Sequence, residues 1–252
     1  MRKFSNLITI VAIAVLTFGC SKTQKPDQNS FLLKGNIQDS DAEYMILSEI
    51  GKTGFIASDT IVLDKNGNFS HLVKMSEETL YSLSLKDDYI TLCPKAKEEI
   101  EIKSSANDFS GTYSVSGSEE STLLKELNNR SNQVRKTLKS MSDYLKSTNI
   151  DNLDSVKHVF VLRLQDIHAQ ELAYSENFIR KNKGSLTTLI ALYRTFEGRP
   201  LFDYRNDLSI HKETLEGLNA TLPNNQHTLI LKKFIEQKEA ENNARLATRE
   251  KK

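Results

Sequence analysis

The chain has 252 residues, of which 27% are charged, 38% hydrophobic and 8% aromatic. These values are typical of a globular protein, and they exclude a disordered chain or a bundle of membrane helices. The formal net charge of +1 gives no electrostatic basis for binding nucleic acid. Two cysteines are too few for a disulfide framework or for a metal site built from four thiolates.

The first residues have the organisation of a secretory signal peptide, which we place at residues 1–19. Arg2 and Lys3 precede an apolar run over residues 7–18, which ends just before Cys20. This run is too short for a permanent membrane helix, which needs about 20 residues. Removal of the segment takes two of the 34 basic residues, which leaves 32 basic and 33 acidic residues and a net charge near −1.

The sequence Leu-Thr-Phe-Gly-Cys at residues 16–20 resembles a bacterial lipobox. In that motif the cysteine becomes the new N-terminus and carries lipid, with acyl chains such as palmitate. Phe18 is larger than the residue that the motif prefers at its position, and the alternative is an ordinary signal peptide with an incidental cysteine. We expect Cys20 to be lipidated and to hold the protein on a membrane surface.

The residues that follow Cys20 have the composition of a flexible tether. Residues 21–30 contain no apolar side chain except Pro26. Ten residues extend at most about 33–36 Å, so the folded part is expected to stay near the bilayer. No acidic run follows Cys20, and this favours an anchor that faces the periplasm. We therefore assign residues 20–30 to a lipidated cysteine and tether.

Residues 31–117 alternate short apolar runs with polar breaks, a pattern typical of antiparallel strands. Such runs at a spacing of roughly 8–12 residues, without a helical pattern between them, predict an antiparallel β-sandwich. Asn66 and Gly67 predict a tight hairpin at residues 64–68, because glycine accepts positive φ angles. The expected strands are Phe31–Ile37, Tyr44–Ile50, Phe55–Val62, Phe69–Lys74, Leu80–Leu85, Tyr89–Leu92, Ile100–Lys103 and Thr112–Val115.

From residue 118 to residue 252 the apolar period becomes helical. Ser118 is the expected N-cap of a first long helix, and Gly184 follows the end of a second one. Their apolar stripes are expected to pair as an antiparallel hairpin. The stripes are Leu123, Leu127, Val134, Leu138, Met141 and Leu145, and Leu153, Val156, Phe160, Leu164, Ile167, Tyr174 and Phe178. Further helices are expected over Leu186–Phe196, over Leu208–Leu218 and from about Asn224. The fold class is therefore α+β, with a sandwich followed by a helical hairpin and connector.

Several short motifs together indicate a family. In the first half they are Phe31–Ile37, Tyr44–Leu47, Asp59–Asp64 leading into Gly67–Ser70, Tyr81–Leu83 and Val115–Ser118. They resemble the domain of unknown function at the N-terminus of thioredoxin-like and peroxiredoxin-like lipoproteins from Bacteroidota. Phe178–Asn182, Ser185-Leu186 and Leu192-Tyr193 resemble the helical connector of the same proteins. The resemblance covers roughly residues 16–236.

In those relatives a thioredoxin-like domain with a Cys-x-x-Cys site follows the connector, and this chain contains no such motif. Because thiol–disulfide exchange within one chain needs two thiols, the resemblance implies no redox activity of this chain alone. Cys93, which follows an apolar strand, is interpreted as a small buried side chain. The alternative is a thiol that forms a mixed disulfide with a separate periplasmic thioredoxin-like partner.

The remaining polar residues form no enzyme motif. His168 and Glu171 are three residues apart, and His158 and Asp166 lie on the same expected helix. His158 and His168 are about 80° apart around that helix, which is poor for joint metal ligation, so a solvated polar face is favoured. The sequence also lacks a glycine-rich phosphate loop, a nucleophile elbow and a His-Glu-x-x-His pattern. We expect no catalytic residue, no metal and no cofactor.

Two short matches concern modification. Asp59-Thr60-Ile61 and Asp154-Ser155-Val156 fit the Asp-Ser/Thr-apolar pattern on which this bacterial group attaches O-glycans. Thr60 and Ser155 are therefore candidate glycosylation sites, although matches of three residues also arise by chance.

The sequence thus predicts a cell-envelope lipoprotein that acts as a non-catalytic binding or interaction module. One alternative is an accessory protein for a separate periplasmic thioredoxin-like or peroxiredoxin-like enzyme. Another is a sensor that binds a small ligand in a cleft between the sandwich and the helices.

Overall fold

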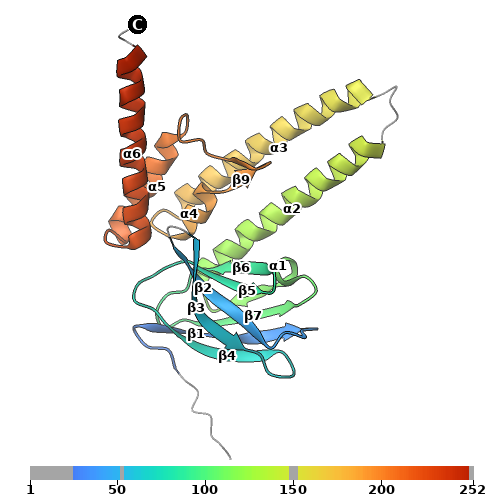
Figure 1. The fold of residues 1–252 in the computed structure, drawn as a ribbon, viewed down its shortest axis with the longest axis vertical. Coiled ribbons are helices and arrows are strands. Elements are labelled where there is room, and N and C mark those ends of the chain that lie inside the picture. The colour runs from blue at the N-terminus through green and yellow to red at the C-terminus, as the bar shows by residue number, and fades with distance from the viewer. Residues whose placement is uncertain (1–24, 52–53, 148–152, 250–252) are drawn as a thin grey trace, which may run out of the picture.

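The computed structural model describes residues 25–51, 54–147 and 153–249. The expected signal peptide, Cys20 and residues 21–24 of the expected tether lie outside the described residues. Strands occupy the first part of the described chain and helices most of the rest, which confirms the α+β class (Figure 1).

The first part of the chain is a β-sandwich. Its strands are β1 (Ser30–Gln38), β2 (Tyr44–Gly51), β3 (Gly54–Val62), β4 (Asn68–Lys74), β5 (Tyr81–Leu85), β6 (Asp88–Leu92), β7 (Glu99–Ser105) and β8 (Ser114–Ser116). Within the described residues they form two four-stranded sheets, with strand orders β4-β1-β7-β8 and β3-β2-β5-β6. The apolar core between the sheets contains Phe31, Leu47, Tyr81, Leu83 and Ile100, all fully buried. These residues stand at alternating positions of their strands, so the period-two pattern predicted the buried face.

Three details of the sandwich differ from the prediction. Strands β1 and β7 pair in parallel, with Leu33 opposite Ile100, whereas an antiparallel sandwich was expected. The turn at residues 64–68 joins β3 of one sheet to β4 of the other and is therefore not a hairpin. The expected strand Thr112–Val115 is wrong at its start, because Phe109–Thr112 form the helical turn α1.

The physical reason is the same in the first two cases. Side-chain alternation specifies which residues face the core, but it does not specify the direction or the identity of the neighbouring strand. The turn itself forms as its residues predict. Gly67 adopts a φ of 76°, and one carboxylate oxygen of Asp64 accepts hydrogen bonds from the backbone N–H groups of Asn66 and Asn68.

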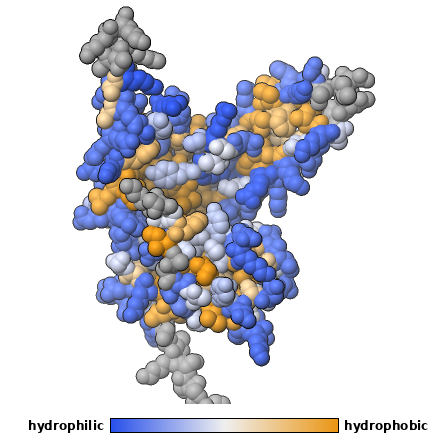
Figure 2. Space-filling model, viewed as in Figure 1, coloured by the Kyte–Doolittle hydropathy of each residue, from blue (hydrophilic) through white to orange (hydrophobic). Residues whose placement is uncertain are grey.

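The helical part begins with two long helices. They are α2 (Glu119–Ser147) and α3 (Leu153–Lys181), which lie side by side and project away from the sandwich, as expected of a hairpin (Figure 1). The hydroxyl of Ser118 accepts a hydrogen bond from the N–H of Ser121, as expected of an N-cap. Apolar side chains remain on the projecting hairpin, where Val159 and Leu162 are more than half exposed (Figure 2).

The remaining elements are α4 (Thr187–Leu192), β9 (Thr195–Phe196), β10 (Arg199–Pro200), α5 (Leu208–Thr221) and α6 (Gln226–Arg249). The expected helix Leu186–Phe196 is therefore too long. The chain leaves α4 and forms the small β9–β10 hairpin, in which Glu197 and Gly198 both have positive φ angles. The final helix begins at Gln226, close to the expected start, and the side chain of Asn225 accepts a hydrogen bond from the N–H of His227.

A second apolar core joins the helices to the sandwich. It contains Leu127, Phe178, Leu192 and other helical residues, together with Leu80 and Cys93 from the ends of two sandwich segments. The outer face of the β3-β2-β5-β6 sheet is thus turned toward the helices. None of the described helices is long and apolar enough to cross a membrane.

Candidate functional site

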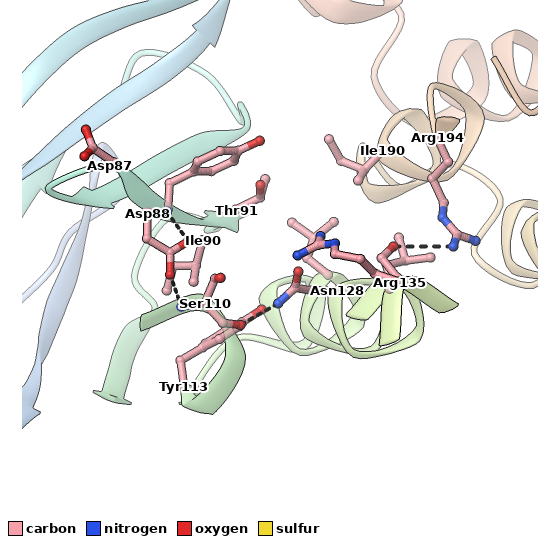
Figure 3. A pocket seen from close by; sticks show the side chains of 14 residues that line it. Asp87, Asp88, Ile90, Thr91, Ser110, Tyr113, Asn128, Arg135, Ile190 and Arg194 are labelled. Atoms are coloured by element: carbon pink, nitrogen blue, oxygen red, sulfur yellow. Dashed lines mark hydrogen bonds between the residues drawn. The ribbon is translucent and has the colours of Figure 1, made fainter. Parts of the chain in front are cut away.

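The sandwich and the helices enclose a cleft where they meet. It consists of two adjoining cavities of about 320 and 590 Å³, which share the residues Tyr89, Thr91, Ser131, Arg135, Ile190 and Arg194. We call the two together the sandwich–helix cleft. Figure 3 shows its smaller half, with β6 on one side and α2 and the α4 segment on the other.

The floor of the cleft is the outer face of the sheet. Thr91 of β6 pairs with Ser82 of β5, which in turn pairs with Ser48 of β2, and both serines are buried. These three side chains share the outer face of the sheet, because successive side chains on a strand point to opposite faces, and Thr91 of this row lines both cavities. Phe55 and Tyr89 border the floor, with ring centroids 5.7 Å apart in an edge-to-face contact.

The opposite wall comes from one face of α2. Ser131, Val134, Arg135 and Leu138 line it, and their spacing of three and four residues places them on the same side of the helix. The chain around and after α4 completes the wall with apolar and aromatic side chains. These are Ile190, Tyr193 and Phe196.

A buried ion cluster holds one end of this wall in place. The carboxylate of Glu171 on α3 is 2% exposed and binds two guanidinium groups, at 2.6 Å from Nε of Arg130 and 2.6 Å from Nη2 of Arg194. Arg194 also donates to the hydroxyl of Ser175 at 2.8 Å. Both guanidinium groups lie near the ring of Tyr174. The cluster therefore ties α2, α3 and the segment after α4 together.

Arg135 differs from Arg194 in its lack of a partner among the described residues. Its guanidinium has no hydrogen bond or ion pair to another described residue, and it lines both cavities. In Figure 3 its side chain points from α2 into the space in front of β6. Arg194, in contrast, donates to Glu171 and Ser175, and at 3.4 Å to the hydroxyl of Ser131.

Hydrogen bonds also fix the sandwich side of the cleft. The N–H of Ser110 donates to the carboxylate of Asp88 at 2.8 Å, and its carbonyl accepts from the side chain of Asn128 at 2.7 Å (Figure 3). A second carboxylate oxygen of Asp88 accepts from the N–H of Tyr89. These contacts link β6, α1 and α2, and they fix the positions of both sides of the cleft.

The start of α6 forms a second contact between the helices and the sandwich. Nε2 of His227 is 2.8 Å from the hydroxyl of Thr79, and the side chain of Asn225 donates to the carbonyl of Glu78 at 2.6 Å. Burial lowers the pKa of His227. This histidine, which is isolated in the sequence, thus belongs to the interface between the two parts of the chain.

Cys93 lies outside the cleft, in the second core. The residue is 2% exposed, its N–H donates to the hydroxyl of Ser121, and its carbonyl accepts from Ser118. Burial and the neighbouring carboxylate of Glu120 raise the pKa of the thiol well above its usual range. Because the thiolate is the reactive form, these surroundings disfavour exchange with a partner.

The residues considered for a metal do not meet. The ring of His168 packs against Phe196, Asp166 forms an ion pair with Arg163, and Glu171 binds its two arginines. In the parts of the chain that the structure describes, no three His, Cys, Asp or Glu side chains gather as a metal site.

The candidate glycosylation residues both lie on the surface. Thr60 is exposed on β3, at the edge of its sheet, and Ser155 is exposed near the start of α3. Either hydroxyl is therefore accessible to a modifying enzyme.

The sequence did not indicate that Arg135, Arg194, Tyr89 or Tyr193 line a cleft. For Arg135 the sequence did contain an indication, because this residue stands between Val134 and Leu138 of the expected apolar stripe. A cation at the border of such a stripe faces the same neighbours as the apolar residues. The pairing of α2 with β6, however, depends on contacts between residues far apart in the sequence.

Comparisons with known proteins find a family match within the first half of the chain. Residues 31–124 match the model of a family described as "Domain of unknown function (DUF4369)". The match includes the sandwich and the first residues of α2, and it confirms the resemblance that the strand motifs indicated.

A solved structure gives a more distant likeness. The crystal structure of a "putative cell adhesion protein" from Bacteroides ovatus is similar over 37% of this chain and 44% of that chain, with 10% sequence identity and a TM-score of 0.22. The match thus spans less than half of the length of that protein. No curated protein matches the chain.

Proposed function

We propose that this chain, whose residues 31–124 form a DUF4369 domain, is a non-catalytic binding module of the cell envelope. The observation that carries the proposal is the sandwich–helix cleft. Its volume falls in the range of small-molecule sites. The larger of its two cavities is lined mainly by apolar and aromatic side chains beside a smaller number of polar groups, as such sites are. Of the three functions that the sequence left open, the cleft therefore favours the binding of a small ligand.

The side chains of the cleft suit binding better than catalysis. General acid–base catalysis needs a titratable group within hydrogen-bond reach of the reacting atom. The carboxylates that line the cleft are Asp87, Asp88 and Glu197, of which Asp88 is occupied by two backbone N–H groups and the other two are exposed. The central polar groups are the hydroxyls of Thr91 and Ser131 and the guanidinium of Arg135. These groups can hold a ligand, and we propose no reaction.

A fixed cleft also supports binding. Leu124 and Leu127 of its lining belong to the second apolar core, and Ile90 belongs to the core of the sandwich. The Glu171 cluster and the Asn128–Ser110 contact tie its walls together. A site that is already formed loses less free energy to ordering when a ligand binds.

The cleft is tested with a neutral probe. N-phenyl-1-naphthylamine fluoresces in apolar surroundings and carries no charge, so we expect saturable fluorescence with the full chain carrying Cys20→Ser. A tryptophan at the floor, Thr91→Trp, should fill the cleft and weaken the binding at least about tenfold. Val62→Trp places the same side chain at an exposed position of β3 outside the cleft and should leave it unchanged. Absence of saturable binding, or equal loss in both variants, would contradict the proposal.

The envelope location rests on residues 1–20. A basic start, an apolar run and a cysteine at the cleavage boundary support a lipid anchor on Cys20, and the composition of residues 21–30 supports a tether that leaves the protein on the periplasmic side. We expect Cys20→Ser to release the protein from the membrane fraction, while Cys93→Ser stays membrane-bound. Unchanged fractionation of the Cys20→Ser chain would overturn the anchor.

The alternative partner, a separate periplasmic thioredoxin-like enzyme, is supported by the family resemblance alone. The buried thiol of Cys93 offers no accessible group for a mixed disulfide. An association of this kind would therefore use surface contacts, and trapping of mixed disulfides in envelope extracts should recover no thioredoxin-like protein through Cys93.

A further inference from the structure

We infer that the sandwich–helix cleft takes a small amphipathic carboxylate, with its apolar body against the aromatic walls and its carboxylate on Arg135. This inference rests on the proposed function, because it names the class of ligand for the same cleft. Two features of the described residues carry it, namely the unpaired charge of Arg135 where the two cavities meet and the apolar surface beside it.

Arg135 places a positive charge, unpaired among the described residues, where the two cavities meet. Arg135 lines both cavities and has no ion pair to another described residue. A guanidinium offers five N–H donors in a planar arrangement that matches a carboxylate, and the ionised hydrogen bonds are stronger than neutral ones. Arg194 differs, because its charge is paired with the carboxylate of Glu171 and it also donates to Ser175 and Ser131.

Three acidic side chains also line the cleft, but none of them forms an ion pair with Arg135. Asp88 accepts hydrogen bonds from the N–H groups of Tyr89 and Ser110, which directs its oxygens toward the backbone. Asp87 is an exposed side chain that lines the smaller cavity, and Glu197 is an exposed side chain on the β9–β10 turn that lines the larger one. Each lines one cavity, whereas Arg135 lines both.

The surface beside Arg135 is apolar and partly open. The larger cavity is lined by Val134, Leu138, Ile190 and the rings of Phe55 and Tyr193. Phe55 and Tyr193 are each more than half exposed. Covering these rings with an alkyl or aromatic body removes apolar surface from water, which is favourable at about 25 cal/mol per Å².

The test compares three probes that share a ten-carbon chain and differ in the head group. Decanoate, decanol and decyltrimethylammonium are titrated against N-phenyl-1-naphthylamine bound to the full chain carrying Cys20→Ser. We expect decanoate to displace the fluorophore at a concentration about tenfold lower than the other two probes, as one charge-assisted contact allows. Equal displacement by the three probes would overturn the inference.

Two substitutions of the arginine sharpen the test. Arg135→Gln should weaken decanoate about tenfold, to the level of decanol, and Arg135→Glu should reverse the preference in favour of decyltrimethylammonium. Lys136→Glu makes the same charge change on the next residue of α2, which lines neither cavity of the cleft, and should preserve the preference. Unchanged decanoate affinity in Arg135→Gln would contradict the inference.

The two proposals fail in different ways. If the neutral fluorophore binds but the head group has no effect, the cleft is a binding site and only the carboxylate assignment is wrong. If the neutral fluorophore does not bind to the wild-type cleft, the proposed function itself is wrong.

Discussion

At the scale of single residues, the two arginines of the cleft show how burial separates structural from binding charges. The Arg194 side chain is 10% exposed and shares the carboxylate of Glu171, whereas Arg135 is exposed and unpaired among the described residues. A charge that is buried must be paired, because its desolvation costs several kcal/mol. An exposed charge needs no partner and is free to meet a ligand.

This distinction gives a prediction for Glu171. Replacing it by glutamine leaves the guanidinium groups of Arg130 and Arg194 without their carboxylate, so Glu171→Gln should lower the free energy of unfolding by about 3–5 kcal/mol. Urea denaturation followed by circular dichroism measures the change. Glu176→Gln on the same helix removes a surface ion pair and should leave the midpoint nearly unchanged. Similar midpoints for both variants would show that the buried cluster is not stabilising.

Cys93 gives a second prediction at this scale. Its thiol is buried and the pKa is raised, so little thiolate forms near pH 7 in the folded protein. In the Cys20→Ser chain Cys93 is the remaining cysteine of the sequence. We expect labelling by a thiol reagent to be slow until urea unfolds the protein. Rapid and complete labelling under native conditions would contradict the buried position.

At the scale of elements, the turn between β3 and β4 shows what a local sequence can and cannot specify. Asp64, Asn66 and Gly67 predicted a turn, and their side chains and φ angles form one. The strands that the turn joins belong to different sheets, because Phe69 pairs with Gly35 of β1 and not with β3. A turn motif contains no information about that pairing, since the partner strand lies about thirty residues earlier.

Two glycines with nearly the same φ angle test this turn. Gly67 has a φ of 76° and Gly198 a φ of 74°, but a Cβ on Gly67 would lie 2.0 Å from the carbonyl oxygen of Ile37, whereas Gly198 faces open space. Gly198→Ala should therefore cost about 1 kcal/mol from the backbone alone. Gly67→Ala should cost more than about 3 kcal/mol, beyond the range of backbone strain. Thermal or urea unfolding measures both, and equal losses would mean that β1 does not pack on the turn.

The contact between α6 and the sandwich predicts a pH dependence. Burial lowers the pKa of His227, so the folded state favours the neutral imidazole and binds fewer protons than the unfolded state as the pH falls. The stability from this residue is present above about pH 6.5, the pKa of an unperturbed histidine, and decreases below it. The urea concentration at the midpoint of unfolding should therefore decrease when the pH is lowered from 7.5 to 5.5.

His227→Gln should show a smaller decrease, because its amide can still hydrogen-bond to Thr79 without titrating. Burial also lowers the pKa of His211, so part of the decrease should remain. If the decrease is equally large in both proteins, His227 does not couple the junction to pH.

At the scale of the whole molecule, the sequence predicted the parts and not their assembly. Period-two alternation placed the strands, and the helical period placed α2 and α3, because both patterns depend only on neighbours in the chain. The cleft arises where β6 meets α2 and α4, through residues such as Thr91, Arg135 and Ile190 that are far apart in the sequence. Leu80 and Cys93 likewise join a core whose other members are helical.

The proposed binding site is the cleft between the two parts of the chain. The most direct test is a ¹H–¹⁵N correlation spectrum of the Cys20→Ser chain titrated with decanoate. We expect saturable shifts of the amides of Thr91, Arg135 and Tyr193, from three elements that only the cleft brings together. Shifts confined to the projecting ends of α2 and α3, or no saturable shifts, would contradict the claim.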